Sequence, residues 1–117
     1  MNSPFAEEVK HFFMNLQDDI CTAIQQKDGM AKFHEDAWAR EGGGGGRTRV
    51  LQDGAIIDKG GVNWSAVYGE LPKNIQKALN LSSDFFFASG VSIVMHPVNP
   101  HVPIIHMNIR YFETRKS

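Results

Sequence analysis

The sequence has 117 residues, 42% of them hydrophobic and 21% charged, which suits a single ordinary domain spanning residues 1–117. Its formal net charge of −1, from 12 basic and 13 acidic residues, argues against general attraction to nucleic acid or anionic membranes. Cys21 is the only cysteine, which excludes an internal disulfide. No run approaches the roughly 18 apolar residues of a membrane span, so we expect a cytoplasmic protein.

A long helix is predicted from Ser3 and Pro4 to Gly29. Serine can cap free amides, proline has no amide to satisfy, and glycine favours a helix end. Steps of three and four produce an apolar stripe, made of Phe5, Val9, Phe12, Phe13, Leu16, Ile20, Ala23 and Ile24. The opposite side carries Glu8, Lys10, Gln17, Asp18 and Gln25.

A strand is predicted over residues 33–40, where the side chains alternate weakly. Five glycines follow at 42–46, and we expect them to break regular structure. The run does not fit a nucleotide-binding loop, because no Gly-Lys-Ser/Thr follows it and no strand-loop-helix frame surrounds it. Two interpretations remain open: a plain linker flanked by exposed arginines, or a mobile loop that brings Arg40, Arg47 and Arg49 to an anionic substrate.

The dipeptide Asp53-Gly54 predicts a two-residue hairpin turn between segments 47–52 and 55–59. With that turn, Arg49 would lie opposite Asp58. We interpret such a pair as an ordinary cross-strand contact rather than a catalytic one.

The rest of the chain alternates extended and helical segments. A further strand is predicted over 62–68 and a short helix over 72–79. Two long extended segments, 85–96 and 102–112, close the chain, joined by a proline-rich stretch at 97–101. This order predicts an α+β fold, an antiparallel sheet with flanking helices.

The last two predicted strands carry polar side chains on one face each. His106, Asn108 and Arg110 project together, and so do Ser92 and His96. If an even register places Ser92 opposite Asn108, then His96 lies diagonal to His106 and all five share one face. Arginine offers a fork to a carboxylate, serine and asparagine add donors, and histidine exchanges protons near neutral pH. The alternative is the solvated face of a half-buried sheet.

Gly90 lies on the same predicted face, where a missing side chain would leave space for a bulky ligand. A metal is a separate possibility. His96 and His106 supply half a coordination shell, and a third ligand is not obvious from the sequence, although His34 and His101 are candidates. We therefore favour a structural or proton-transfer role for these histidines over a metal role.

The order of these residues resembles the oxygen-dependent coproporphyrinogen III oxidase family. The resemblance rests on four strings: FHEDAWAREGGGGGRTRVLQDG at 33–54, KGGVN at 59–63, GVSIVMHP at 90–97 and NPHVPIIHMNIRYFE at 99–113. Together they extend it over nearly the whole chain.

The resemblance implies oxidative decarboxylation by O2 of two propionates of coproporphyrinogen III to vinyl groups. The products are protoporphyrinogen IX, CO2 and hydrogen peroxide, made in haem biosynthesis by a cytosolic homodimer without an organic cofactor. By motif, Ser92, Asn108, Ile109 and Arg110 would bind substrate and His106 would be the proton donor. His96 and His106 would be proposed ligands of a divalent metal, which is not an established requirement.

Family members are longer than this chain. A GGGxDLTP-like segment, whose aspartate is thought to hold pyrrole nitrogens, is absent from the 117 residues. We therefore expect the N-terminal portion of the oxidase, inactive alone. A truncated product, an encoded fragment and half of a split enzyme all remain open. The alternative is a non-enzymatic tetrapyrrole-binding or assembly module that needs a partner chain.

Overall fold

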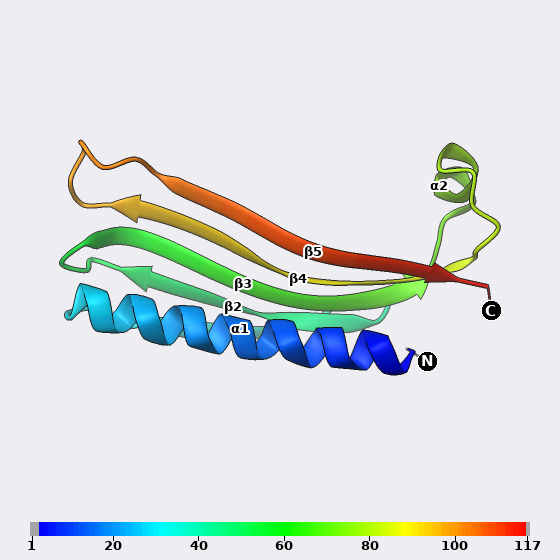
Figure 1. Ribbon diagram of the computed structural model, residues 1–117, viewed down its shortest axis with the longest axis horizontal. Helices are drawn as coiled ribbons and strands as arrows, with labels where there is room; N and C mark the ends of the chain where they lie inside the picture. The colour runs from blue at the N-terminus through cyan, green and yellow to red at the C-terminus, as the bar shows by residue number, and fades with distance from the viewer. Residues whose placement is uncertain (1–2, 117) are drawn as a thin grey trace.

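A computed structural model describes residues 3–116 of the chain. One antiparallel sheet carries a long helix along one face (Figure 1). The strands follow one another in chain order across the sheet: β1 (His34–Ala39), β2 (Gly44–Gln52), β3 (Ile57–Glu70), β4 (Phe85–Pro97) and β5 (Ile105–Arg115). The helices are α1 (Pro4–Asp28) and the short α2 (Lys73–Ala78), between β3 and β4. The predicted α+β architecture is confirmed.

Helix α1 begins and ends where the sequence predicts. The hydroxyl oxygen of Ser3 accepts a hydrogen bond from the amide of Ala6 at 3.0 Å, which caps the first turn. At the other end Gly29 has a φ of 76°, and its amide donates to the carbonyl of Gln25. Glycine adopts this left-handed conformation without steric cost, so it ends the helix.

The predicted apolar stripe of α1 is only partly covered by the sheet. Phe5 and Phe12 are 56% and 63% exposed, whereas Gln17, expected on the polar side, is fully buried. The Gln17 side-chain amide donates to the carbonyls of Arg47 and Val62. The prediction was wrong for these three helix residues, because periodicity does not fix which edge of a wide stripe meets the sheet. Burial of the glutamine is tolerated because its polar atoms are paired.

The core lies between α1 and the central strands. Its buried members are Ala6, Phe13, Cys21, Val62, Trp64, Ala66, Phe87, Val91, Ile93 and Met95. The molecule measures 50 × 26 × 22 Å, with a radius of gyration of 16.8 Å. A compact domain of this length has a radius of gyration of about 13 Å. The fold is therefore an extended two-layer structure, in which much of the sheet is open.

The connection between β2 and β3 is longer than the predicted two-residue turn. Residues 53–56 separate the end of β2 from the start of β3. Gln52 pairs with Lys59, and Arg49 lies opposite Val62 rather than Asp58. Both predictions were wrong.

The wider loop is held by Asp28, at the end of α1. Its buried carboxylate accepts hydrogen bonds from five backbone amides, those of Met30, Ala31, Ala55, Ile56 and Ile57. These bonds place the pKa of the Asp28 carboxyl well below its ordinary value. A contact with a residue so far back in the chain could not be read from the local Asp-Gly signal.

The glycine run interrupts regular structure only at Gly42 and Gly43, which lie in the turn between β1 and β2. For the other three glycines the prediction was wrong. Gly44 to Gly46 form the first part of β2 and pair with β3, which is one continuous strand rather than two. A Cβ at Gly46 would run into the carbonyl oxygen of Trp64 and the indole of Trp38. Glycine is required here because the neighbouring strand and side chain leave no room.

Candidate functional site

Strands β4 and β5 bring the predicted polar residues together. The register contains three relevant pairs: Ser92 with Asn108, Val94 with His106, and Gly90 with Arg110. His96 follows Val94 by two positions, so it lies diagonal to His106. The predicted even register is confirmed. We call the side of the sheet opposite α1 that carries Ser92, His96, His106, Asn108 and Arg110 the polar face.

The polar face is open to solvent. His96, His106, Asn108 and Arg110 are exposed, and Ser92 is half-buried. Among residues 3–116, no hydrogen bond or ion pair joins these five side chains to another group. Their donors are therefore free to meet a ligand.

Gly90 does not provide the space predicted for a bulky ligand. A Cβ at this position would run into the carbonyl oxygen of Ile109 and approach the Cα of Arg110 at 3.0 Å. The expectation was wrong, because the missing side chain accommodates the close backbone of β5 rather than leaving a hollow.

Ile109 lies between two polar-face residues in sequence, but its side chain projects to the opposite side of the sheet. It pairs with Val91 and is 42% exposed. Any contact of Ile109 with a ligand on the polar face would have to come from its main chain.

Two of the arginines beside the glycine run lie under α1. Arg47 pairs with Asp18 of the helix at 3.2 Å, and Arg49 pairs with Asp18 at 2.8 Å and with Glu35 at 2.9 Å. Neither guanidinium reaches the polar face. The carboxylates that bind them come from α1 and β1, so these arginines join the helix to the sheet.

Arg40 is also engaged within the fold. Its guanidinium donates to the carbonyl of Tyr68 at 2.8 Å and lies 5.6 Å from the centre of the Phe86 ring. Both interpretations left open by the sequence were therefore wrong: the run is neither a linker nor an arginine-bearing mobile loop.

The only cysteine is buried beside one of these arginines. Burial raises the pKa of the Cys21 thiol, and the hydrogen bond with Arg49 offsets part of the rise. The thiol is therefore protonated at neutral pH, as is usual for a small buried helix residue.

The described residues fit only part of a metal site. His96 and His106 are diagonal neighbours, but a coordination shell needs three or four ligands. No group of three or more His, Cys, Asp or Glu side chains comes together within residues 3–116. His34 lies on β1, at the other edge of the sheet, and His101 lies in the β4–β5 loop. This set does not make a metal centre.

A family model described as coproporphyrinogen III oxidase matches residues 8–117. The chain belongs to the coproporphyrinogen III oxidase family. The predicted resemblance is thus confirmed, and the match covers all five strands and most of α1. The family consists of oxidoreductases that act on coproporphyrinogen III in haem biosynthesis. Within residues 3–116, neither helix has the length and the apolar character that a membrane span requires.

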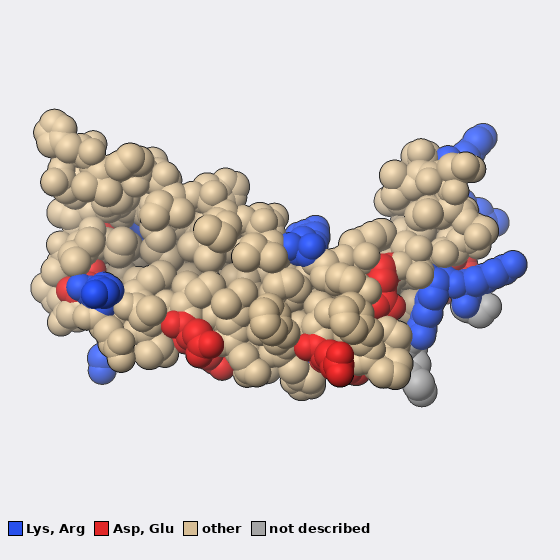
Figure 2. Space-filling view, in the orientation of Figure 1, with Lys and Arg blue, Asp and Glu red and all other residues tan. Residues whose placement is uncertain are grey.

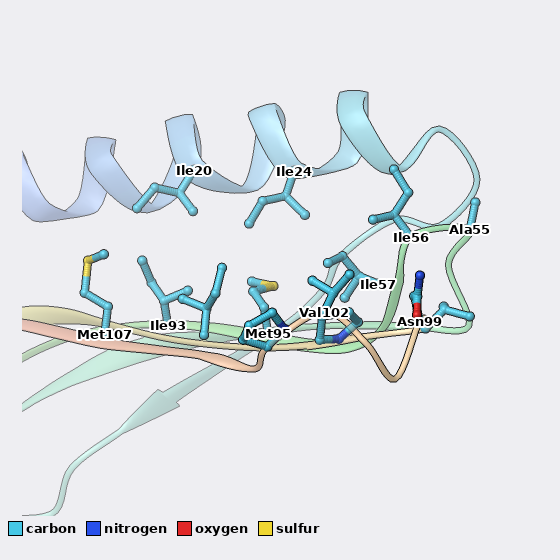
Figure 3. Close-up of a pocket in the computed structure, with 14 residues that line it drawn as sticks. Ile20, Ile24, Ala55, Ile56, Ile57, Ile93, Met95, Asn99, Val102 and Met107 are labelled. Carbon is cyan, nitrogen blue, oxygen red and sulfur yellow. The ribbon is translucent and has the colours of Figure 1, made fainter.

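Sequence reasoning missed an apolar groove on the helix side of the sheet (Figure 3). Ile20 and Ile24 point from α1 toward Ile93, Met95 and Met107 on the sheet. The groove has a volume of about 680 Å³. The residues that line the groove are apolar except Asn99, and none of them is charged. The charged side chains visible in Figure 2 lie along the lower edge, at both ends and near the middle of this face.

The groove is open because β5 extends beyond the cover of α1. Ile105, Met107 and Ile109 are 53%, 48% and 42% exposed, although all three project to the helix side. Their alternation with the polar residues of β5 was the signal for a second, apolar face of this strand. The sheet thus presents a polar side and an apolar side at the same edge.

Proposed function

We propose that the polar face binds the propionate carboxylates of coproporphyrinogen III. The observation that carries this proposal is the alignment of Ser92 with Asn108 and of Gly90 with Arg110, which puts a guanidinium and two neutral donors side by side. Arginine holds a carboxylate through two parallel N–H bonds, and the amide and hydroxyl can satisfy its remaining lone pairs. Ile109 contributes through its main chain.

The reaction is O2-dependent oxidative decarboxylation. In each step a propionic acid side chain and O2 yield a vinyl group, CO2 and hydrogen peroxide, with the two electrons of the substrate passing to O2. His106 acts as the proton donor on the polar face, because an imidazole side chain can carry a proton on either ring nitrogen and pass it to a bound group. No organic cofactor takes part, and the two histidines furnish only half of a shell for a divalent metal.

The chain by itself binds substrate but does not turn it over. The polar side chains are exposed and no described helix packs over them, so water has free access to a bound tetrapyrrole. Catalytic sites depend on a water-excluded, preorganised environment. A homodimer partner or a C-terminal half of the oxidase would complete the site in the cytoplasm, a compartment that suits a single unpaired cysteine.

Titration with coproporphyrin III, the stable oxidised analogue, tests the binding step. Its fluorescence should change on mixing with the parent chain, and Arg110→Ala should weaken binding at least tenfold while leaving urea unfolding unchanged. Equal affinity of the two proteins would contradict the proposal. Protoporphyrin fluorescence after exposure of the chain to coproporphyrinogen III and air tests turnover, and rapid product formation would overturn the claim of inactivity.

A second candidate is a non-enzymatic tetrapyrrole-binding or assembly module that works with a partner chain. The open edge of β5 and its exposed Ile105, Met107 and Ile109 favour it, because unpaired edges and apolar patches invite association. Size in solution discriminates: light scattering that gives a stable monomer would count against a missing partner.

A further inference from the structure

The polar face continues beyond β4 onto β3. Asn63 is the register partner of Ser92 on the side away from Asn108. Directly opposed side chains in an antiparallel sheet share a face, with Cβ atoms about 5 Å apart. Three neutral hydrogen-bonding side chains therefore form one row across three neighbouring strands.

Asn63 is available to a ligand, whereas its next neighbour is engaged. Asn63 is exposed, and within residues 3–116 its side chain meets no hydrogen-bond partner. Thr48, which follows it on β2, accepts a hydrogen bond from the indole nitrogen of Trp38 at 3.2 Å. The row of free donors thus runs from Asn108 to Asn63 and ends there.

The surface beside Asn63 is formed by the backbone of Gly61, which lacks a side chain. A Cβ at Gly61 would lie on the same face as Asn63 and would meet only the carbonyl oxygen of Arg49, at 4.0 Å. This position differs from Gly90, where backbone atoms block a side chain. A ligand group that approaches Asn63 therefore finds open space next to it.

Asn63 stands at a useful distance from the arginine. It lies two strands from Arg110 and two residues along, which gives a Cα separation of about 12 Å from ordinary sheet spacings. The long arginine side chain can shorten that span. Lys59 projects from β3 on the same side, opposite His96, so the surroundings of Asn63 favour an anion over a cation.

We propose that Asn63 is a further substrate-binding residue, whose side-chain amide donates to a second carboxylate of the tetrapyrrole while Arg110 holds the first. The inference rests on the proposed function of the polar face. With Asn63, β3 becomes the third strand that contributes to the polar face, so that a ligand with two or more carboxylates is held at two points.

Coproporphyrin III titrations of single variants test this assignment. Asn63→Ala should weaken binding about tenfold, as expected for one hydrogen bond to a charged group. Asn63→Asp should weaken it further, because a carboxylate would face a carboxylate. Gly61→Ala, whose added methyl group fits the fold, should also weaken binding, and Asn15→Ala, on the exposed side of α1, should bind like the parent chain.

The outcomes distinguish a failure of this inference from a failure of the proposed function. If Arg110→Ala binds weakly and Asn63→Ala binds like the parent, Asn63 lies outside the site and only this inference fails. If Asn63→Asp binds as tightly as the parent, the group above it is not a carboxylate and the inference fails as well. If Arg110→Ala has no effect, the proposed function itself is wrong. Urea unfolding of each variant shows whether it is folded. If Asn63→Ala does not fold, the affinity of Gly61→Ala tests whether the ligand reaches this part of β3.

Discussion

Replacing Arg47 by methionine separates the arginines that hold the fold from those that meet substrate. The Arg47 side chain is 20% exposed and donates to Gln17 at 2.9 Å, to the carbonyl of Met14 at 3.0 Å and to Asp18 at 3.2 Å. It also lies 5.5 Å from the centre of the Trp64 ring. Arg47→Met keeps much of the apolar stem but removes these four interactions and a longer ion pair with Glu35 at 3.8 Å.

The expected loss of stability is about 3 kcal/mol. Each of the three hydrogen bonds contributes about 1 kcal/mol, after a discount for the partly exposed Asp18. The cation–π contact adds about 0.5 kcal/mol, and contacts of the methionine with its surroundings offset a similar amount. A chain of this size has a total stability of about 5–15 kcal/mol, so the variant should still fold.

Urea unfolding followed by far-UV circular dichroism measures the effect, with Lys32→Met as an exposed control that should change stability by less than about 0.5 kcal/mol. Coproporphyrin III affinity of the folded variant should equal that of the parent. A loss below about 1 kcal/mol would refute the account of the helix–sheet contacts. Weaker porphyrin binding at unchanged stability would mean that Arg47 contacts the ligand rather than stabilising the fold.

Three further predictions concern single sites. Asp28→Asn should destabilise the chain at pH 7. The difference in melting temperature from the parent should shrink as pH falls below the ordinary carboxyl pKa of 3.8, because the lowered pKa of Asp28 in the folded chain means that only the ionised carboxylate stabilises the fold. A constant difference down to pH 2 would contradict this. Cys21 should resist Ellman's reagent at pH 8 until urea unfolds the chain, and fast labelling of the native protein would place the thiol at the surface. Gly46→Ala should cost about 1–3 kcal/mol in urea unfolding through its clash with Trp64, whereas a neutral result would mean that the strands can separate there.

Local signals predicted most of the elements. The Ser3-Pro4 start and the Gly29 end of α1 depend on residues within one helical turn, and both are found. The face shared by Ser92 and Asn108 followed from strand parity and one assumed register. These features involve neighbours in the chain or a single hairpin, so the sequence contains what determines them.

Contacts between distant residues produced the errors. Asp28 widens the β2–β3 loop by binding amides almost thirty residues away, and Asp18 draws Arg47 and Arg49 beneath the helix. The carbonyl oxygen of Trp64 and the indole of Trp38 lie so close to Gly46 that only glycine fits this position of β2. None of these partners is marked by spacing or composition, so only the folded arrangement reveals them.

The central claim is that the tetrapyrrole carboxylates bind the polar face and not the apolar groove on the helix side. An NMR titration of isotope-labelled chain with coproporphyrin III tests it most directly, because the two surfaces have separate reporters. The account predicts that the side-chain amide signal of Asn108 and the guanidinium signal of Arg110 shift, while the methyl signals of Ile20 and Met107 stay in place. Shifts confined to Ile20 and Met107 would contradict it.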